Sequence, residues 1–255
     1  MFLYIMRLPL GVWMGNILNN SINWLKKSSA NIVSIGRIFF VFIAVYLIVT
    51  HDTTQSFFVT KQMAKEAGVA YYWAFVCTIL AFALDGLDGY LARKFNASSK
   101  LGATLDIMGD RIAEYSYWIL FAVMGWISIV FPLIAIIRGV VVDGIRSVAA
   151  SYGYTAFGAK SMQDDPVAKF ICCSKFMRIW YAVAKVGAFM LIILYNVPSM
   201  DHDVSVFWQV FAYIFTEMAI LLCVLRGLPV VYESKKFFKD AAEETSDKVE
   251  ESVNQ

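Results

Sequence analysis

The segment DGLDGYLAR, residues 85–93, is followed after eight residues by GATLDIMGD, residues 102–110. Each segment carries two aspartates, and each overlaps a long apolar stretch, 70–92 and 102–126. An ionisable side chain inside a membrane span costs on the order of 2.5–3.5 kcal/mol on insertion scales. Four acids placed here therefore indicate a polar site embedded in apolar sequence.

The rest of the chain is apolar enough for a membrane protein. Of its 255 residues, 59% are hydrophobic and 16% are charged, which is too few charges to cover a soluble globule. A bilayer-spanning helix needs about 20 predominantly apolar residues. The stretches that qualify are 31–50, 70–92, 102–126, 128–150, 174–196 and 205–226. We expect an all-α integral membrane protein, a six-transmembrane-helix bundle that contacts membrane lipids and no nucleic acid.

The two ends of the chain differ from this bundle. Residues 1–29 are apolar but hold Pro9 and no small-residue cleavage pattern, which argues against a signal peptide and favours an interfacial segment in the headgroup layer. Residues 231–255 alternate Glu, Asp and Lys, as expected of a charged, solvated tail. Residues 30–230 form the predicted membrane domain. The absence of a transit or signal segment favours a prokaryotic cell membrane.

Lys and Arg residues predict the orientation, because short cytoplasmic loops are enriched in them. One side of the predicted bundle carries Arg7, Lys26 and Lys27 before the first span, Arg93, Lys94 and Lys100 after the second, Lys160 and Lys169 after the fourth, and Lys235, Lys236 and Lys239 in the tail. The other side carries Lys61 and Lys65. Both termini and the connections 93–101 and 151–173 should therefore face the cytoplasm.

The aspartates are spaced to share helix faces, Asp85 with Asp88 at i, i+3 and Asp106 with Asp110 at i, i+4. If the two spans pair antiparallel, a rise of about 1.5 Å per residue brings the four acids to similar depths. Facing carboxylates repel one another unless cations lie between them. Oxygen ligands suit Mg²⁺ or Mn²⁺, and two such ions would balance the four negative charges. The alternative is that the acids pair with Arg93 and Arg111 or cap helices.

Other reactive side chains are scarce. His51 and His202 both fall in predicted loops, so we expect no histidine nucleophile or base. The four cysteines lie in or beside apolar stretches and lack clustered histidines, which indicates packing residues. The chemistry therefore rests on the aspartates.

The complete pattern, from Asp85 through Asp88, Gly89, Ala92 and Arg93 to Gly102, Asp106 and Asp110, resembles the signature of the CDP-alcohol phosphotransferase family. The resemblance implies a homodimer of six-helix protomers with a polar cavity open to the cytoplasm and two metal ions. It also implies that Asp85, Asp88 and Asp106 ligate metal, while Asp110 is both a ligand and the base for the acceptor hydroxyl. The reaction it implies is attack of an alcohol on CDP-diacylglycerol, which expels CMP.

The remaining signature residues suit binding of the CDP-linked donor. Gly89, Ala92 and Gly102 are small enough for close approach of a nucleotide, although small residues also serve helix packing. A guanidinium can contact phosphate oxygens bidentately, so Arg93 is a candidate partner for the donor diphosphate, with a headgroup anchor as the alternative.

A second cationic set suggests the acceptor. It comprises Arg138 and Arg146 in the fourth span, and Lys169, Lys175 and Arg178 near the fifth. We favour an anionic phosphate as their partner over ordinary topogenic charges. The stretch IIRGVVVDGIRSVAASYG and the opening NIVSIGRIFF, with Asn31 and Arg37, resemble the phosphatidylglycerophosphate synthases of the family. The chain departs from the common pattern of those synthases at Ile107, Arg111 and Gly139, where they usually have Pro, Lys and Glu.

Glycerol 3-phosphate is therefore the favoured acceptor, with inositol phosphate, serine or an amino alcohol as alternatives. A cation transporter could use the same acids, but it has no need of Gly89, Ala92, Arg93 and Gly102 in fixed register with them. The third hypothesis is a catalytically inactive membrane scaffold. The intact acids argue against it.

Overall fold

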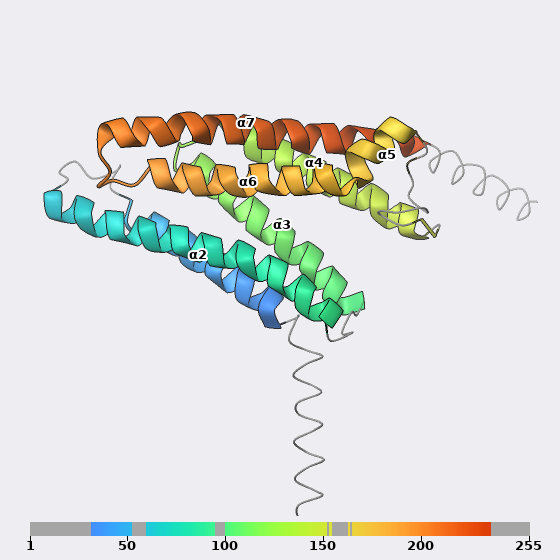
Figure 1. The fold of residues 1–255 in the computed structure, drawn as a ribbon, viewed down its shortest axis with the longest axis horizontal. Coiled ribbons are helices and arrows are strands. Elements are labelled where there is room, and N and C mark those ends of the chain that lie inside the picture. Colours follow the sequence, from blue (N-terminus) through green and yellow to red (C-terminus); the bar gives the residue numbers. More distant parts are fainter. Residues whose placement is uncertain are drawn as a thin grey trace, which may run out of the picture. The chain divides into compact units, whose positions relative to one another are not determined.

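The computed structural model describes residues 32–52, 60–94, 100–151, 153–154, 163 and 165–235, with the side chains of 88–94, 100, 101 and 103 left out of that description. Every element in these residues is a helix (Figure 1). The helices are Ile32–Thr50, α2 (Lys61–Lys94), α3 (Lys100–Val123), α4 (Val130–Ser151), α5 (Pro166–Cys173), α6 (Lys175–Tyr195) and α7 (His202–Glu233). The expected all-α class is confirmed.

Four of these helices are long and apolar enough to cross a membrane. They contain the spans Ile32–Thr50, Lys61–Leu87, Lys175–Tyr195 and His202–Glu233. Two other helices, α3 and α4, match the predicted third and fourth spans in position, but each holds at least three charged residues. The six-span count therefore remains a prediction for these two helices. The predicted segments 1–29 and most of 231–255 lie outside the described residues.

Contacts divide the chain into two compact units, one of which comprises residues up to 58 and Val69–Glu114. In this unit, the buried face of the helix Ile32–Thr50 is formed by residues at helical spacing: Ser34, Arg37, Val41, Ala44 and Ile48. The buried face of α2 includes Ala74, Thr78 and Ala81. Small side chains permit close helix approach in membranes. Since Asp85 follows Ala81 by four residues, it lies on the continuation of that face.

The second unit comprises Val59–Gly68 and residues from Tyr115 onward. Here α6 and α7 run side by side, and α4 and α5 also pack on α7 (Figure 1). An aromatic cluster joins α3 to α6. Phe189 lies with its ring centroid 5.2 Å from Tyr117, 4.9 Å from Trp118 and 5.8 Å from Phe121. All four side chains are fully or almost fully buried, so this cluster forms part of the core of the unit.

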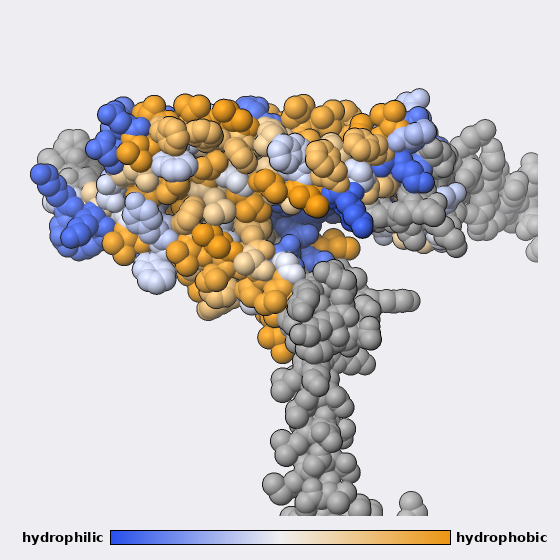
Figure 2. Space-filling view, in the orientation of Figure 1, coloured by the Kyte–Doolittle hydropathy of each residue, from blue (hydrophilic) through white to orange (hydrophobic). Residues whose placement is uncertain are grey.

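Apolar side chains also cover much of the exposed surface. Figure 2 shows hydrophobic residues over much of the drawn face of α7, and large side chains such as Trp73, Phe176 and Leu221 are exposed. Soluble monomers rarely expose contiguous apolar patches of this kind. The apolar helices therefore indicate an integral membrane protein.

Helix boundaries differ from the sequence-based prediction in three places. The second helix begins at Lys61, nine residues earlier than predicted, because Lys, Gln, Glu and Ala in this stretch are good helix formers even though they are polar. The last helix continues to Glu233 instead of ending at 226. The short helix α5 was not predicted. It begins with Pro166 and is capped by Asp165, whose carboxylate accepts a hydrogen bond from the Ala168 backbone N–H at 2.9 Å.

The aromatic core gives a stability prediction. Phe189 is 0% exposed, so Phe189→Ala should leave a cavity among three aromatic rings and cost about 3–5 kcal/mol. The matched control is Phe176→Ala on the same helix, where the side chain is 63% exposed. Thermal unfolding in detergent should show a clearly lower midpoint for Phe189→Ala than for Phe176→Ala. Equal midpoints for the two variants would contradict a core at this position.

Candidate active site

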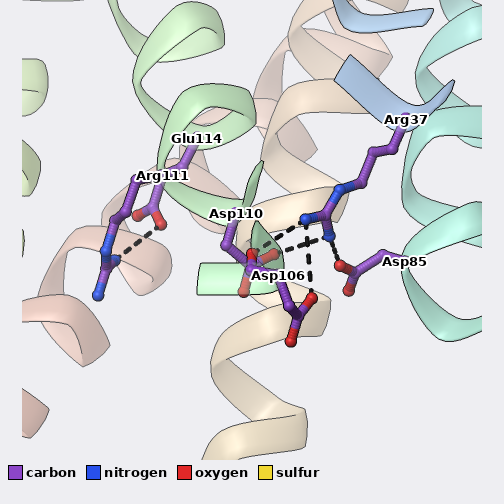
Figure 3. A network of polar contacts seen from close by, with 6 residues as sticks. All are labelled: Arg37, Asp85, Asp106, Asp110, Arg111 and Glu114. Carbon is purple, nitrogen blue, oxygen red and sulfur yellow. Dashed lines mark hydrogen bonds and ion pairs between the residues drawn. The ribbon is translucent and has the colours of Figure 1, made fainter. Parts of the chain in front are cut away.

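Arg37 connects three of the four predicted site aspartates within the first unit (Figure 3). Its Nη1 contacts Oδ1 of Asp85 and donates a hydrogen bond to Oδ1 of Asp110 at 3.1 Å. Its Nη2 donates to the backbone carbonyl oxygen of Asp106 at 3.1 Å and lies 3.7 Å from the Asp106 carboxylate. One guanidinium from the first described helix therefore contacts acids from both α2 and α3.

The burial of these groups is unequal. The Arg37 side chain is 1% exposed, whereas the side chains of Asp85, Asp106 and Asp110 are 38%, 52% and 51% exposed. The guanidinium thus lies beneath a partly open set of carboxylates. Ions and substrates can reach the acids, while Arg37 is held by the protein.

Gly109 is the local feature of α3 that permits this arrangement. Because Asp106 and Asp110 are four residues apart, both lie on the same face of the helix, and Gly109 lies beside them. A Cβ atom added at Gly109 would overlap Nη2 of Arg37 and lie 3.2 Å from Cζ. The absent side chain therefore leaves the space that the guanidinium occupies.

The three acids fit a divalent cation. One carboxylate oxygen from each of Asp85, Asp106 and Asp110 lies within 4.8 Å of the other two. Mg²⁺ takes oxygen ligands at about 2.0–2.1 Å, so opposite ligands lie about 4 Å apart. The three oxygens are therefore spaced close to what ligands of one bound ion require. The structure therefore brings together three of the four predicted acids, Asp85, Asp106 and Asp110, and their metal-binding role stays a prediction.

Other signature residues are placed only in part. Asp88, Gly89, Ala92 and Arg93 lie in α2, but their side chains are outside those described. Gly102 lies near the start of α3 and is half-buried. The predicted roles of these residues in metal and donor binding therefore remain predictions.

The sequence left open that the acids pair with Arg93 and Arg111. Among the described side chains, the ion-pair partner of Asp85, Asp106 and Asp110 is Arg37. Arg111 Nη1 lies 3.4 Å from Oε2 of the buried Glu114, while Asp85, Asp106 and Asp110 contact Arg37. From the sequence, Arg37 was expected only as part of a family resemblance, with no role in the site. The sequence does indicate that Arg37 has a polar partner, because a lone arginine inside an apolar span is costly.

Arginines also gather in the second unit, around Tyr181 of α6. The Arg138 and Arg226 Cζ atoms lie 5.9 and 5.3 Å from the centroid of the Tyr181 ring, within cation–π range. Arg138 Nε donates to the Cys223 carbonyl oxygen at 3.1 Å, and Arg226 Nη2 donates to the Cys172 carbonyl oxygen at 3.4 Å. Arg226 is buried and was not among the residues predicted from the sequence.

Arg146 is close enough to Arg138 and Arg226 for the three charges to repel one another. We call these three residues the arginine cluster. Lys169 on α5 and Lys175 at the start of α6 are exposed. The structure thus brings Arg226 near the two predicted arginines, and the predicted acceptor roles of Lys169 and Lys175 stay predictions.

Gly139 stands where the synthases that the sequence resembles usually have Glu, and the structure explains why a small residue is needed here. A Cβ atom at this position would overlap the hydroxyl oxygen of Tyr115, and it would lie 3.0 Å from the Tyr115 Cζ atom. A larger residue therefore cannot replace Gly139 unless Tyr115 moves.

Most of the chain matches a known protein family. Residues 27–225 match the sequence profile of the family described as CDP-alcohol phosphatidyltransferase. The chain belongs to this family. The match includes both the acidic site and most of the arginine cluster's helices, although Arg226 lies one residue beyond its end.

Individual relatives carry two different acceptor names. The chain is 30% identical over 126 residues to a CDP-diacylglycerol–glycerol-3-phosphate 3-phosphatidyltransferase of Mycoplasma pneumoniae, covering 48% of this chain and 55% of that protein. It is 28% identical over 127 residues to a CDP-diacylglycerol–inositol 3-phosphatidyltransferase of Candida albicans, covering 49% of this chain and 52% of that protein. The chain thus spans about half the length of these relatives.

Proposed function

We propose that this protein transfers a phosphatidyl group from CDP-diacylglycerol to an alcohol and releases CMP, as a step in phospholipid biosynthesis. The observation that carries this proposal is the convergence of Asp85, Asp106 and Asp110, three acids of the family signature, at one partly open place. Membership of the family supports a transferase. It gives no support to a cation transporter.

Two divalent cations, Mg²⁺ or Mn²⁺, are the proposed cofactors, held by Asp85, Asp88, Asp106 and Asp110. When bound, they would neutralise negative charge on the attacking and leaving oxygens. Asp110 is the proposed base and accepts the proton of the acceptor hydroxyl. Its carboxylate is 51% exposed, so an alcohol can approach it from outside the helix pair.

Other residues of the signature position the donor. Arg93 contacts the diphosphate of CDP-diacylglycerol, and Gly89, Ala92 and Gly102 leave room for the nucleotide. The alcohol oxygen forms a bond to the phosphorus next to the diacylglycerol, and the bond from that phosphorus to the CMP oxygen breaks. No covalent enzyme intermediate is required.

The proposed acceptor is glycerol 3-phosphate. The arginine cluster supports it, because Arg138 and Arg226 lie against the same Tyr181 ring and guanidinium groups bind phosphate oxygens bidentately. A relative named for glycerol 3-phosphate supports it as well, while a relative named for inositol keeps inositol as the second candidate. Lys169 and Lys175 are proposed to attract the anionic acceptor from the surface.

The proposed setting is a prokaryotic cell membrane, with the active site and both termini on the cytoplasmic side. The Lys and Arg asymmetry of the connections supports this orientation. A homodimer is proposed from the family resemblance.

A CMP-release assay tests the proposed function. Purified protein with CDP-diacylglycerol and Mg²⁺ or Mn²⁺ should release CMP when glycerol 3-phosphate is added, and chelation by EDTA should stop the release. Inositol, inositol phosphate, serine and an amino alcohol form the comparison panel. Release with another acceptor alone would replace the proposed acceptor, and no release with any acceptor would contradict the transferase.

The proposed roles of the acids predict different defects. Asp110→Asn should lower turnover by roughly 10²–10⁴-fold, as is typical when a general base is removed, while still binding metal and CDP-diacylglycerol. Asp85→Asn should instead weaken metal binding and, through it, donor binding. Metal titrations and donor-binding isotherms distinguish the two. Near-normal turnover of Asp110→Asn, or a loss of metal equal to that of Asp85→Asn, would contradict the base assignment.

The arginine cluster predicts a defect confined to the acceptor. Because a hydrogen bond to a charged group contributes about 1.5–3 kcal/mol, Arg138→Ala or Arg146→Ala should raise the KM for glycerol 3-phosphate by about 10- to 100-fold. The affinity for CDP-diacylglycerol should change less. Lys65→Ala, at an exposed position on α2 with no proposed role in acceptor binding, is the control and should change the KM little. Unchanged acceptor kinetics in both arginine variants would rule out this phosphate site.

A further inference from the structure

We propose that Arg37 is a resident counter-cation of the acidic site, which holds the carboxylates together before divalent ions bind and weakens the binding of those ions. This inference rests on the proposed metal site and assigns to it a residue outside the aspartate signature. The carboxylates of Asp85, Asp106 and Asp110 all lie within 4 Å of the Arg37 guanidinium.

The electrostatic argument begins with the acids alone. Carboxylates whose oxygens lie within 4.8 Å of one another repel, and the repulsion raises the free energy of the metal-free site. The guanidinium supplies one positive charge at the centre of the three groups. It therefore stabilises the site when no divalent ion is present.

The same charge opposes an incoming ion. A divalent cation bound to these carboxylates would lie close to the guanidinium, and both are positive. Arg37 also uses hydrogen-bonding capacity of the carboxylates that a metal would need, since it donates to Oδ1 of Asp110 and contacts Oδ1 of Asp85. Both effects lower the affinity for metal.

The surroundings of Arg37 keep its guanidinium at the acids. Its side chain is buried, so it cannot extend to a lipid headgroup as an ordinary topogenic arginine does. Its Nε has no hydrogen-bond partner among the described residues. Its Nη atoms donate hydrogen bonds to Asp110 and to the Asp106 carbonyl oxygen. The space that it fills is provided by Gly109.

Metal binding without substrate tests this inference. Detergent-purified, metal-free protein is titrated with Mn²⁺, and free Mn²⁺ is read from its electron paramagnetic resonance signal. Arg37→Gln should bind Mn²⁺ at least about tenfold more tightly than wild type, because a positive charge next to the ion is removed. It should also unfold at a lower temperature in EDTA and gain more from added Mn²⁺. Arg37→Lys keeps the charge and should remain close to wild type in Mn²⁺ affinity.

Gly109→Ala tests the same inference without removing a charge. The added methyl group would displace the guanidinium from the acids, so Mn²⁺ affinity should rise in the same direction as in Arg37→Gln. Gly36→Ala is the matched control, because a Cβ atom at Gly36 has nothing within 4 Å. Adding Asp85→Asn to either affinity-raising variant should remove the gain, which assigns the gain to this site. Gly109→Ala also serves as the test if Arg37→Gln does not fold.

The outcomes separate this inference from the metal site itself. Mn²⁺ binding by wild type with no gain in Arg37→Gln or Gly109→Ala would overturn the inference alone, as would an equal gain in Arg37→Lys. No Mn²⁺ binding by wild type or any variant would overturn both the inference and the proposed metal site.

Discussion

The contact of the Arg37 guanidinium with acids from α2 and α3 is the interaction on which the first unit depends. A buried arginine is costly unless charged and polar partners surround it, and removing one partner of a buried ion pair typically costs about 3–5 kcal/mol. Among the helices described in this unit, the helix that holds Arg37 is the one without an acid of the signature. Its contacts therefore tie that helix to the other two at the level of the acids.

Small residues make this contact possible. Ala44, Ala74 and Ala81 are buried on the faces where helices approach, and Gly109 leaves space beside Asp106 and Asp110. Thr78 satisfies its own buried hydroxyl by donating to the Ala74 carbonyl oxygen at 2.8 Å. The unit therefore joins apolar, closely packed helix faces to a charged group placed where α2 and α3 carry their acids. The half-exposed carboxylates keep that group accessible to ions.

Much of this site could be predicted from sequence because helix geometry determines it. The i, i+4 spacing places Asp106 and Asp110 on one face, and antiparallel pairing brings Asp85 to their level. Arg37 could not be placed in this way, since its span is apolar on all sides and periodicity does not show which face is buried. Arg226 was missed for a different reason, because it lies near the end of a long apolar helix and resembles a topogenic charge. The early start of α2 was missed because polar helix formers precede the apolar stretch.

The central claim is that these carboxylates form a divalent-cation site. Anomalous diffraction at the manganese absorption edge, from crystals grown with Mn²⁺, tests it most directly. We predict an anomalous peak within coordinating distance of carboxylate oxygens from Asp85, Asp106 and Asp110, with the Arg37 guanidinium no longer bridging all three acids. A cluster without an anomalous peak at saturating Mn²⁺, in which Arg37 still bridges the three acids, would contradict the claim.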